Sequence, residues 1–453
     1  MTTTIIITFC VLLLIAYVFD LTSSKTKIPS VILLLILGWA VKQLTIMLGI
    51  QLPDFSPILP VLGTVGLVLI VLEGALELEL NKSKFGLIGK SFLGALLPMI
   101  ALAFLLAFAF WCFGNFELKD GLINALPLCV ISSAIAIPSV SNLSSHHREF
   151  IIYESSLSDI LGVIIFNFLV INETIDKFSF LNFGLQLLII IVVSFIATIG
   201  LAFLLSKIKH HIKFVPIILL VVLIYSIAKI YHLPGLILIL IFGLSIANLD
   251  ELKRFKWIEK FKPDELKIEV NKFKELTGEG TFLVRTLFFL LFGYSIETSE
   301  VLNTDTILWA LGIVFFIFLF RAIQLKLSKL PLQPLLFVAP RGLITVLLFL
   351  SIEPIHRISL VNNSLIIQVI ILTALLMMIG LMRYKKPQAK ESTTTSDGNG
   401  TSDSNITNNG DITNDGDITN DGDITNDDDS TNNHSHTHIP EQESPETLTS
   451  KLL

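Results

Sequence analysis

Long apolar runs recur along the chain, and they constrain its fold more than any other feature. They approach the roughly 20 residues that a helix needs to cross a bilayer. There are thirteen, at residues 4–21, 27–47, 57–79, 87–113, 121–144, 150–171, 180–206, 213–231, 233–249, 281–298, 305–327, 333–352 and 364–383. Hydrophobic residues make up 53% of the 453-residue chain and charged residues only 15%, which excludes an ordinary soluble domain. The runs predict an all-α polytopic membrane protein with about thirteen transmembrane helices.

Basic residues divide unevenly between the two sets of loops that thirteen spans would place on opposite sides. The odd-numbered loops and the segment after the last span carry 23 of them, and the even-numbered loops carry 5. Cytoplasmic loops are enriched in Lys and Arg, so we expect the N-terminus outside and the C-terminal tail in the cytoplasm of a plasma-membrane protein. The first run lacks a positive start and a cleavage site, and we expect a retained helix rather than a signal peptide.

The composition also divides the chain into two parts. Residues 1–386 carry all the spans, whereas residues 387–453 form an acidic tail rich in Asn, Asp and Thr, which we predict to be disordered and cytoplasmic. Between the ninth and tenth spans, residues 250–280 alternate apolar and basic side chains, and they predict an amphipathic helix on the inner leaflet. We expect no cofactor and no nucleic-acid partner. An odd span count also permits two inverted six-helix repeats with one helix left over.

Two acids interrupt the sixth apolar run. Charged side chains inside a membrane are costly and usually mark an ion or proton path. On a helix, Ser155 and Asp159 lie about 40° apart, whereas Glu154 and Asp159 lie about 140° apart. Asp159 and Ser155 can therefore face one cavity, while Glu154 turns toward another helix where a guanidinium would neutralise it. Arg321 or Arg285 could supply that guanidinium.

This division of the two acids suggests a transport mechanism at Asp159. Desolvation favours the protonated carboxyl, and a bound cation favours the ionised carboxylate, so proton and cation compete for one group. Hard monovalent cations take oxygen ligands, and the predicted set is Asp159, Ser155 and the Ser132–Ser133 segment. With one titrating group, the predicted activity is an electroneutral exchange of a monovalent cation, sodium first, for a proton, serving pH and cation homeostasis.

Helix breakers lie inside two of the spans. The fifth contains Ser132-Ser133-Ala134 before Pro138, and the twelfth contains Pro340-Arg341-Gly342. Interrupted helices at corresponding places of two halves point to a transporter's binding site, and Arg341 would offset the C-terminal helix dipoles there. The simpler interpretation is that each proline only kinks its helix. Glu73, about two turns inside the third span, could be a cavity-facing functional acid or a structural one.

Several short motifs together resemble the monovalent cation:proton antiporters, in particular the sodium/proton exchanger branch. The resemblance covers about residues 10–385. The motifs are Ile28-Pro29-Ser30-Val31, Glu73-Gly74-Ala75-Leu76, the Glu-Ser-x-x-x-Asp that begins at Glu154, Phe288-Phe289-Leu290-Leu291-Phe292-Gly293, Arg321 and Arg341-Gly342.

The resemblance implies roles that the residues alone do not give. Asp159 would bind the ion and carry the proton, Ser155 would be a second ligand, and Glu154 would pair with Arg321. The family also implies interrupted helices that cross at mid-membrane and a homodimer in membrane lipid. A mobile core bundle, about residues 87–171 and 305–384, would move against an interface scaffold, about residues 4–79 and 180–298.

Two departures from the family pattern leave the cation open. The fifth span usually carries Thr-Asp-Pro, but here it reads Ser-Ser-Ala-Ile from Ser132, so a second acid is missing. Ser158 stands where the exchanger branch commonly has Asn. Potassium and lithium therefore remain candidates beside sodium, so a potassium/proton antiporter is the nearest alternative. Without the second acid, a membrane sensor that does not transport also stays open.

An intramembrane hydrolase is the alternative from another class, and the histidines argue against it. His146, His147, His232 and His356 fall in loops or at span ends, so no Ser/His pair fits inside the membrane. The sequence predicts a transporter and not an enzyme.

Overall fold

The computed structural model describes residues 2–26, 28–49, 57–78, 82–173, 176–207, 214–231, 233, 235–248 and 263–384. The regular structure in these ranges is helical throughout. The elements are α1 (Thr2–Thr26), α2 (Ser30–Met47), α3 (Leu59–Glu77), η1 (Lys82–Lys84), α4 (Phe85–Gly114), α5 (Leu118–Cys129), α6 (Ser133–Ser139), α7 (Ser145–Ile171), α8 (Lys177–Lys207), α9 (Phe214–Ile230), α10 (Leu236–Ala247), α12 (Pro263–Ser295), α13 (Thr298–Val301), α14 (Thr304–Leu327), η3 (Leu335–Phe337), α15 (Leu343–Leu350), η4 (Pro354–His356) and α16 (Asn363–Arg383). The tail prediction for residues 387–453 lies outside the described residues.

Each of the thirteen predicted spans coincides with a helix or an interrupted pair. Within the described ranges, nine helical stretches are long and apolar enough to cross a membrane, and three shorter apolar helices accompany them. The remaining range, residues 333–352, holds η3 and α15. The prediction of an all-α polytopic membrane fold is confirmed, because apolar run length is a direct requirement of the bilayer.

One expectation about the scaffold is wrong in part. Residues 263–280 do not form a separate surface helix, because α12 runs without a break from Pro263 to Ser295 and joins them to the tenth span. Two apolar side chains of this segment pack inside the protein, whereas Ile268 is exposed. Val270 and Phe273 are buried, and the Phe273 ring contacts those of Phe214 and Phe242. Residues 250–262 of the expected amphipathic helix lie outside the described ranges.

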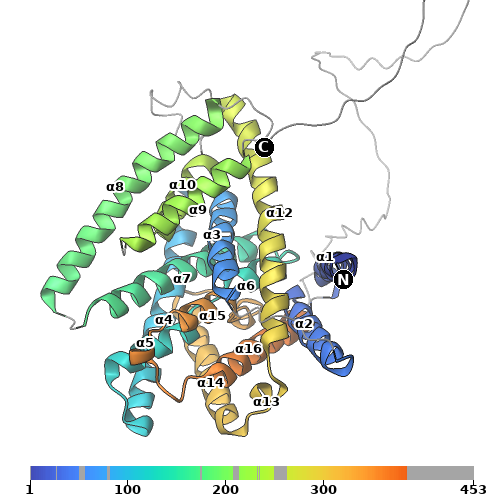
Figure 1. Ribbon diagram of the computed structural model, residues 1–453. Coiled ribbons are helices and arrows are strands. Elements are labelled where there is room, and N and C mark those ends of the chain that lie inside the picture. The colour runs from blue at the N-terminus through green and yellow to red at the C-terminus, as the bar shows by residue number, and fades with distance from the viewer. Residues whose placement is uncertain are drawn as a thin grey trace, which may run out of the picture. The chain divides into compact units, whose positions relative to one another are not determined.

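The helices pack as two bundles within residues 1–388. In the first, α4 packs on α5, α7 and α14, and α14 packs on α16; we call α4–α7, α14, η3, α15 and α16 the core bundle. In the second, α12 packs on α2 and α3, and α10 packs on α3 and α8; we call α1–α3, α8–α10 and α12 the scaffold bundle. Figure 1 shows α4, α5, α14 and α16 together in the lower part of the view and α8, α9 and α10 in the upper part.

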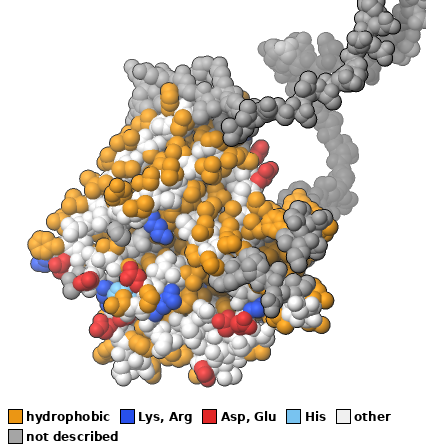
Figure 2. Space-filling model, viewed as in Figure 1, with side chains coloured by type: hydrophobic (Ala, Val, Ile, Leu, Met, Phe, Trp, Pro, Cys, Tyr) orange, Lys and Arg blue, Asp and Glu red, His pale blue; other side chains and the backbone are white. Residues whose placement is uncertain are grey.

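The surface of the scaffold bundle is apolar on the face that Figure 2 shows. Hydrophobic side chains spread over α8, α9 and α12, and charged side chains form only small groups. Exposed hydrophobics on α8 include Leu188, Ile189, Val192 and Ile196. In water such a surface would associate, whereas in a bilayer it meets a solvent of its own polarity.

The two predicted helix breaks meet. The fifth span ends as α5 at Cys129 and restarts as α6 at Ser133, and the twelfth passes from η3 through an extended segment to α15. The backbone N–H of Ser132 donates to the carbonyl of Pro340 at 2.9 Å, so each break satisfies a polar group of the other. The interpretation of the prolines as simple kinks is therefore wrong.

Candidate ion-binding site

Asp159 lies on α7 at the break between α5 and α6. Its side chain is 2% exposed. One carboxylate oxygen, Oδ2, accepts a very short hydrogen bond from the Ser133 hydroxyl and a longer one, at 3.4 Å, from the Ser133 N–H. The other oxygen, Oδ1, is buried without a hydrogen-bond partner among the described residues. A buried acceptor without a partner costs free energy, so Oδ1 is free to bind a ligand.

The serines near Asp159 form different hydrogen bonds. Ser158 accepts the N–H of Ile131 at 2.9 Å and so fixes the extended backbone of the break. Ser155 donates to the Ile151 carbonyl of its own helix at 2.8 Å, which leaves its oxygen lone pairs as an acceptor. Ser132, fully buried, contributes its backbone to the crossing of the two breaks. Ser133 is the predicted ligand that the structure brings into contact with Asp159.

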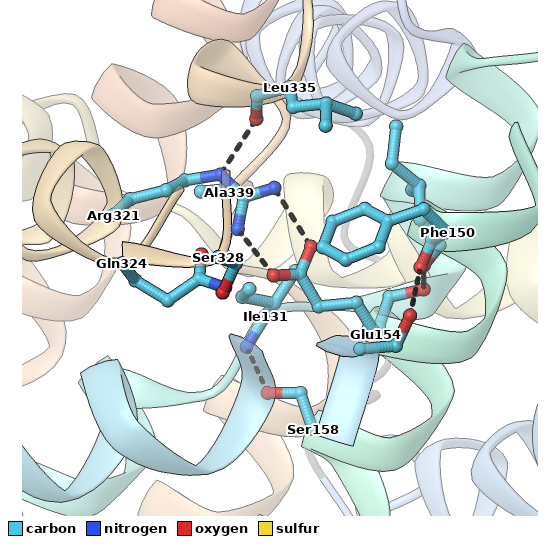
Figure 3. Close-up of polar contacts among 12 residues, drawn as sticks. Ile131, Phe150, Glu154, Ser158, Arg321, Gln324, Ser328, Leu335 and Ala339 are labelled. Carbon is cyan, nitrogen blue, oxygen red and sulfur yellow. Dashed lines mark hydrogen bonds and ion pairs between the residues drawn. The ribbon is translucent and has the colours of Figure 1, made fainter. Parts of the chain in front are cut away.

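Glu154 faces the opposite way from Asp159 and meets Arg321 of α14. The guanidinium donates two parallel hydrogen bonds to the carboxylate, at 3.0 and 2.8 Å, and a third from Nε to the Leu335 carbonyl at 2.7 Å (Figure 3). The side chains are only 1% and 2% exposed. This bidentate geometry is the strongest that the two groups can form, and it leaves Glu154 neutralised.

Gln324 is a polar neighbour of this pair that the sequence interpretation missed. It lies one helical turn after Arg321 on α14, is buried, and donates to the Ser328 hydroxyl at 3.2 Å. A Cβ at Gly94 of α4 would lie 2.8 Å from Glu154 Oε1 and 2.9 Å from the Gln324 amide nitrogen, so a side chain there would have to displace these two groups. The available signal was a glutamine three residues after an intramembrane arginine.

Arg341, in the break of the twelfth span, binds backbone carbonyls where the two helix breaks meet. Its guanidinium is buried and donates to the carbonyl of Leu128 near the C-terminal end of α5 at 2.7 Å and to that of Ala339 at 2.9 Å. Its backbone N–H donates to the Thr373 hydroxyl of α16 at 3.1 Å. A fixed positive charge thus lies on carbonyls that the interrupted helices leave without partners.

Glu73 and Arg285 lie in the scaffold bundle, and neither forms a hydrogen bond or an ion pair with Asp159 in the part of the chain that the structure describes. Glu73 on α3 is half-buried and faces α12, where a Cβ at Gly278 would lie 3.5 Å from its Oε1. Arg285 Nη2 lies 3.6 Å from Asp20 Oδ1 of α1. Of the two candidate partners for Glu154, Arg321 is therefore the one in contact, and Arg285 pairs elsewhere.

Two cavities lie along α7, one on each side of Asp159 in the sequence of the helix. One, of about 220 Å³, lies at the Ser145 end and reaches Ile152 and Tyr153. The other, of about 350 Å³, lies toward the Ile171 end and reaches Val163 and Phe166. Both are lined by residues of the core and scaffold bundles together. Asp159 lies between them along the helix.

The donor set suits a transiently bound hard cation better than a tightly held metal. Among the described residues, no three His, Cys, Asp or Glu side chains cluster as ligands for a metal ion. Asp159 instead offers a carboxylate beside the Ser133 hydroxyl, and oxygens are the ligands that hard cations prefer. One carboxylate can hold either a proton or a monovalent cation.

An all-α membrane bundle in which two interrupted helices meet beside a buried carboxylate has the architecture of a secondary transporter. The chain belongs to the sodium/hydrogen exchanger family, whose transmembrane model matches residues 10–382. It is a multi-pass membrane protein of a family of secondary transporters that exchange cations and protons, and not an enzyme.

Solved structures share the fold. The sodium proton antiporter MjNhaP1 from Methanocaldococcus jannaschii, determined at pH 8, is 20% identical, with a TM-score of 0.61 over 84% of this chain and 96% of that one. An electron-microscopy map of the same antiporter matches with a TM-score of 0.61 and 20% identity over 85% of this chain and all of the other. No curated protein sequence matches the chain significantly.

Proposed function

We propose that the protein exchanges a monovalent cation for a proton at Asp159. The observation that carries this is the buried Asp159 carboxylate, which has one oxygen without a partner and no ion pair among the described residues. The two buried arginines of the core bundle have other partners, because Arg321 binds Glu154 and Arg341 binds backbone carbonyls. Asp159 is thus the carboxylate of the core bundle that is free to change its occupant.

The exchange follows from the competition between two occupants. In its dry surroundings Asp159 is stable when it carries a proton or when a cation neutralises it, and it is costly as a bare anion. A cation that arrives through a cavity displaces the proton into the water of that cavity. After the core bundle has moved, a proton from the other side displaces the cation. One site with one titrating group exchanges one cation for one proton, which is electroneutral.

The two cavities support an alternating-access cycle. Because each is lined by both bundles, a shift of the core bundle against the scaffold bundle would widen one cavity and close the other. Ser133 on α6 and Asp159 on α7 belong to the same bundle and would move together. We assign the moving part to about residues 87–171 and 305–384 and the scaffold, with a homodimer interface, to about residues 4–79 and 180–298.

We propose sodium as the first cation, with lithium and potassium as the alternatives to be measured beside it. Two observations support sodium. The antiporter of similar fold is described as a sodium proton antiporter, and the oxygen ligands at Asp159 suit a hard cation. We further propose the plasma membrane as the location, with the N-terminus outside, a cytoplasmic tail and a role in pH and cation homeostasis.

The test is collapse of a pH gradient in proteoliposomes on addition of sodium, lithium or potassium. Asp159→Asn is expected to lower the rate to that of protein-free liposomes, because an amide neither ionises nor exchanges a proton. Ser133→Ala should retain exchange with a weaker apparent affinity for the cation. Asp176→Asn, which changes an aspartate at the exposed start of α8, is the matched control and should match wild type.

Two results would contradict the proposal. Exchange that survives in Asp159→Asn would place the titrating group elsewhere. A folded wild-type protein that collapses the gradient with none of the three cations would favour a membrane sensor without transport.

A further inference from the structure

One face of α7 passes both cavities and the acid between them. Ile152, Ser156, Asp159, Val163 and Phe166 recur at intervals of four and three residues, so they share this face. The first of them lines the cavity at the Ser145 end, and the last two line the cavity at the Ile171 end. Ser156 and Asp159 therefore occupy the part of the face that separates the cavities, and both side chains are buried.

Ser156 lies against Gly74 of α3 in this separating part. A Cβ at Gly74 would lie 2.9 Å from Ser156 Oγ and 3.9 Å from Ser156 Cβ, and Ile137 Cδ1 of α6 would also be 3.9 Å away. The helices can approach this closely because glycine has no side chain. The Gly74–Ser156 contact thus joins the scaffold bundle to the core bundle about 4.5 Å along the helix axis from Asp159.

A small apolar cluster lies between this contact and the cavity at the Ser145 end. Leu78, Ile152 and Tyr153 are buried together apart from the main core, and Ile137 and Leu244 pack against them. Leu78 follows α3 and Leu244 lies on α10, so the cluster also joins the two bundles. Its three buried members line the cavity. A cation in that cavity therefore meets the cluster before it meets Ser156.

The Ser156 hydroxyl is left unsatisfied by this packing. Its oxygen is buried without a hydrogen-bond partner among the described residues, whereas the adjacent Ser155 hydroxyl donates to the Ile151 carbonyl. A buried hydroxyl without a partner costs free energy, and water that entered from the cavity would remove that cost. The close contact therefore carries a local penalty that its separation relieves.

We propose that the Gly74–Ser156 contact closes the path between Asp159 and the cavity at the Ser145 end. The path opens when α7 separates from α3 at this point, and it closes when Ser156 returns to the space that Gly74 leaves free. Each cycle of exchange then requires this contact to break and to form again. This inference rests on the proposed exchange at Asp159.

The experiment locks the contact with a disulfide. The distance of 3.9 Å between the two Cβ positions is close to the roughly 3.8 Å typical of disulfides. The Gly74→Cys/Ser156→Cys double variant would be reconstituted in proteoliposomes, oxidised with copper phenanthroline and mapped by mass spectrometry of the linked peptides. Exchange of sodium, or of lithium or potassium if wild type exchanges it faster, should be lost in proportion to the linked fraction and should return with dithiothreitol.

Three controls separate a locked path from a damaged site. Each single variant should exchange equally before and after oxidation, which accounts for the native cysteines. Gly121→Cys/Ala107→Cys, whose Cβ positions are 3.3 Å apart, links α4 to α5 within the core bundle and should leave exchange unchanged. The cation should still raise the thermal midpoint of the linked Gly74→Cys/Ser156→Cys protein in detergent, because Asp159 stays accessible from the cavity at the Ile171 end.

A bulky side chain at position 74 tests the same contact without a cross-link. Gly74→Val should lower the exchange rate, because its methyl groups keep α7 from returning to α3. Ser156→Gly in the same chain should restore part of the rate, since it clears the space that the valine needs. Gly184→Val on α8 is the control and should match wild type, because nothing lies within 4 Å of a Cβ there.

Several results would overturn the proposal. They are a disulfide that does not form in the folded double variant, full exchange in the linked protein, equal loss in Gly121→Cys/Ala107→Cys, loss of the thermal response to the cation, and a wild-type rate in Gly74→Val. Failure of the proposed exchange gives a different pattern, because wild type and the reduced double variant would then lack exchange as well.

Discussion

The core and scaffold bundles each hold an intramembrane arginine, and the two arginines are paired in different ways. In the core bundle, Arg321 and Glu154 meet at 2.8 Å with side chains 2% and 1% exposed. In the scaffold bundle, Arg285 and Asp20 are 3.6 Å apart, and the aspartate is 35% exposed. Loss of one partner from the core pair strands a charge in a dry place, whereas water can reach the scaffold pair.

The backbones pack more closely in the scaffold bundle than at the helix breaks of the core bundle. The scaffold helices α2 and α12 approach so closely that a Cβ at Gly38 or Gly293 would overlap the backbone of the other helix. The core bundle instead contains two interrupted helices held by side-chain hydrogen bonds. The scaffold is thus fixed by close backbone packing, and the core by polar contacts around an open carboxylate. We expect them to respond differently to substitution.

Glu154→Gln should have the largest effect on stability. It leaves the Arg321 guanidinium buried without a countercharge, and such a loss costs about 3–5 kcal/mol. We expect a lower thermal midpoint in detergent and a lower yield, with little change in the pH profile of the remaining exchange. A strong shift of the pH optimum instead would mean that Glu154 titrates during the cycle.

Gly293→Ala should have an intermediate effect, confined to the scaffold. Its Cβ would lie 2.8 Å from Leu35 Cα and 3.0 Å from the Leu35 carbonyl carbon, so α2 and α12 must move apart. Overpacking of this kind costs about 1–3 kcal/mol. Gly312→Ala on α14 is the control, because nothing lies within 4 Å of a Cβ there. Thermal unfolding that is equal for the two variants would contradict the assignment of close packing to the scaffold.

Arg285→Gln should have the smallest effect. Its ion pair with Asp20 is long, and water can reach the 35% exposed aspartate and screen the charge that remains, so we expect a smaller loss than for the core pair. Thermal unfolding beside Glu154→Gln measures the contrast directly. Equal destabilisation by the two substitutions would contradict the claim that the burial of the Arg321–Glu154 pair makes its loss more costly.

Much of the fold could be predicted because its causes are local. Run length gave the thirteen spans, and the angle between residues on one helix gave different surroundings for Glu154 and Asp159. The boundary of α12 could not be found in this way. The polar residues at 263–280 resembled a surface helix, and only the packing of Phe273 against other helices shows that the segment is internal.

The candidate site was less predictable, because its contacts join distant parts of the chain. The residue spacing left two arginines open for Glu154, and Arg321 reaches it because α7 and α14 both pack on α4. Ser155, Ser132 and Ser133 were all expected near Asp159, and among them Ser133 from α6 makes the contact.

The sequence by itself determined that this chain spans a membrane many times and that one apolar helix carries two acids on different faces. Both follow from properties that a short segment possesses alone: its hydrophobic length and its helical period. The sequence also predicted that Glu154 is the neutralised acid, but only the tertiary structure decided which arginine neutralises it and which serine contacts Asp159. That choice depends on the side chains that neighbouring helices bring to each face, and these come from positions 167 residues away for Glu154 and 26 for Asp159.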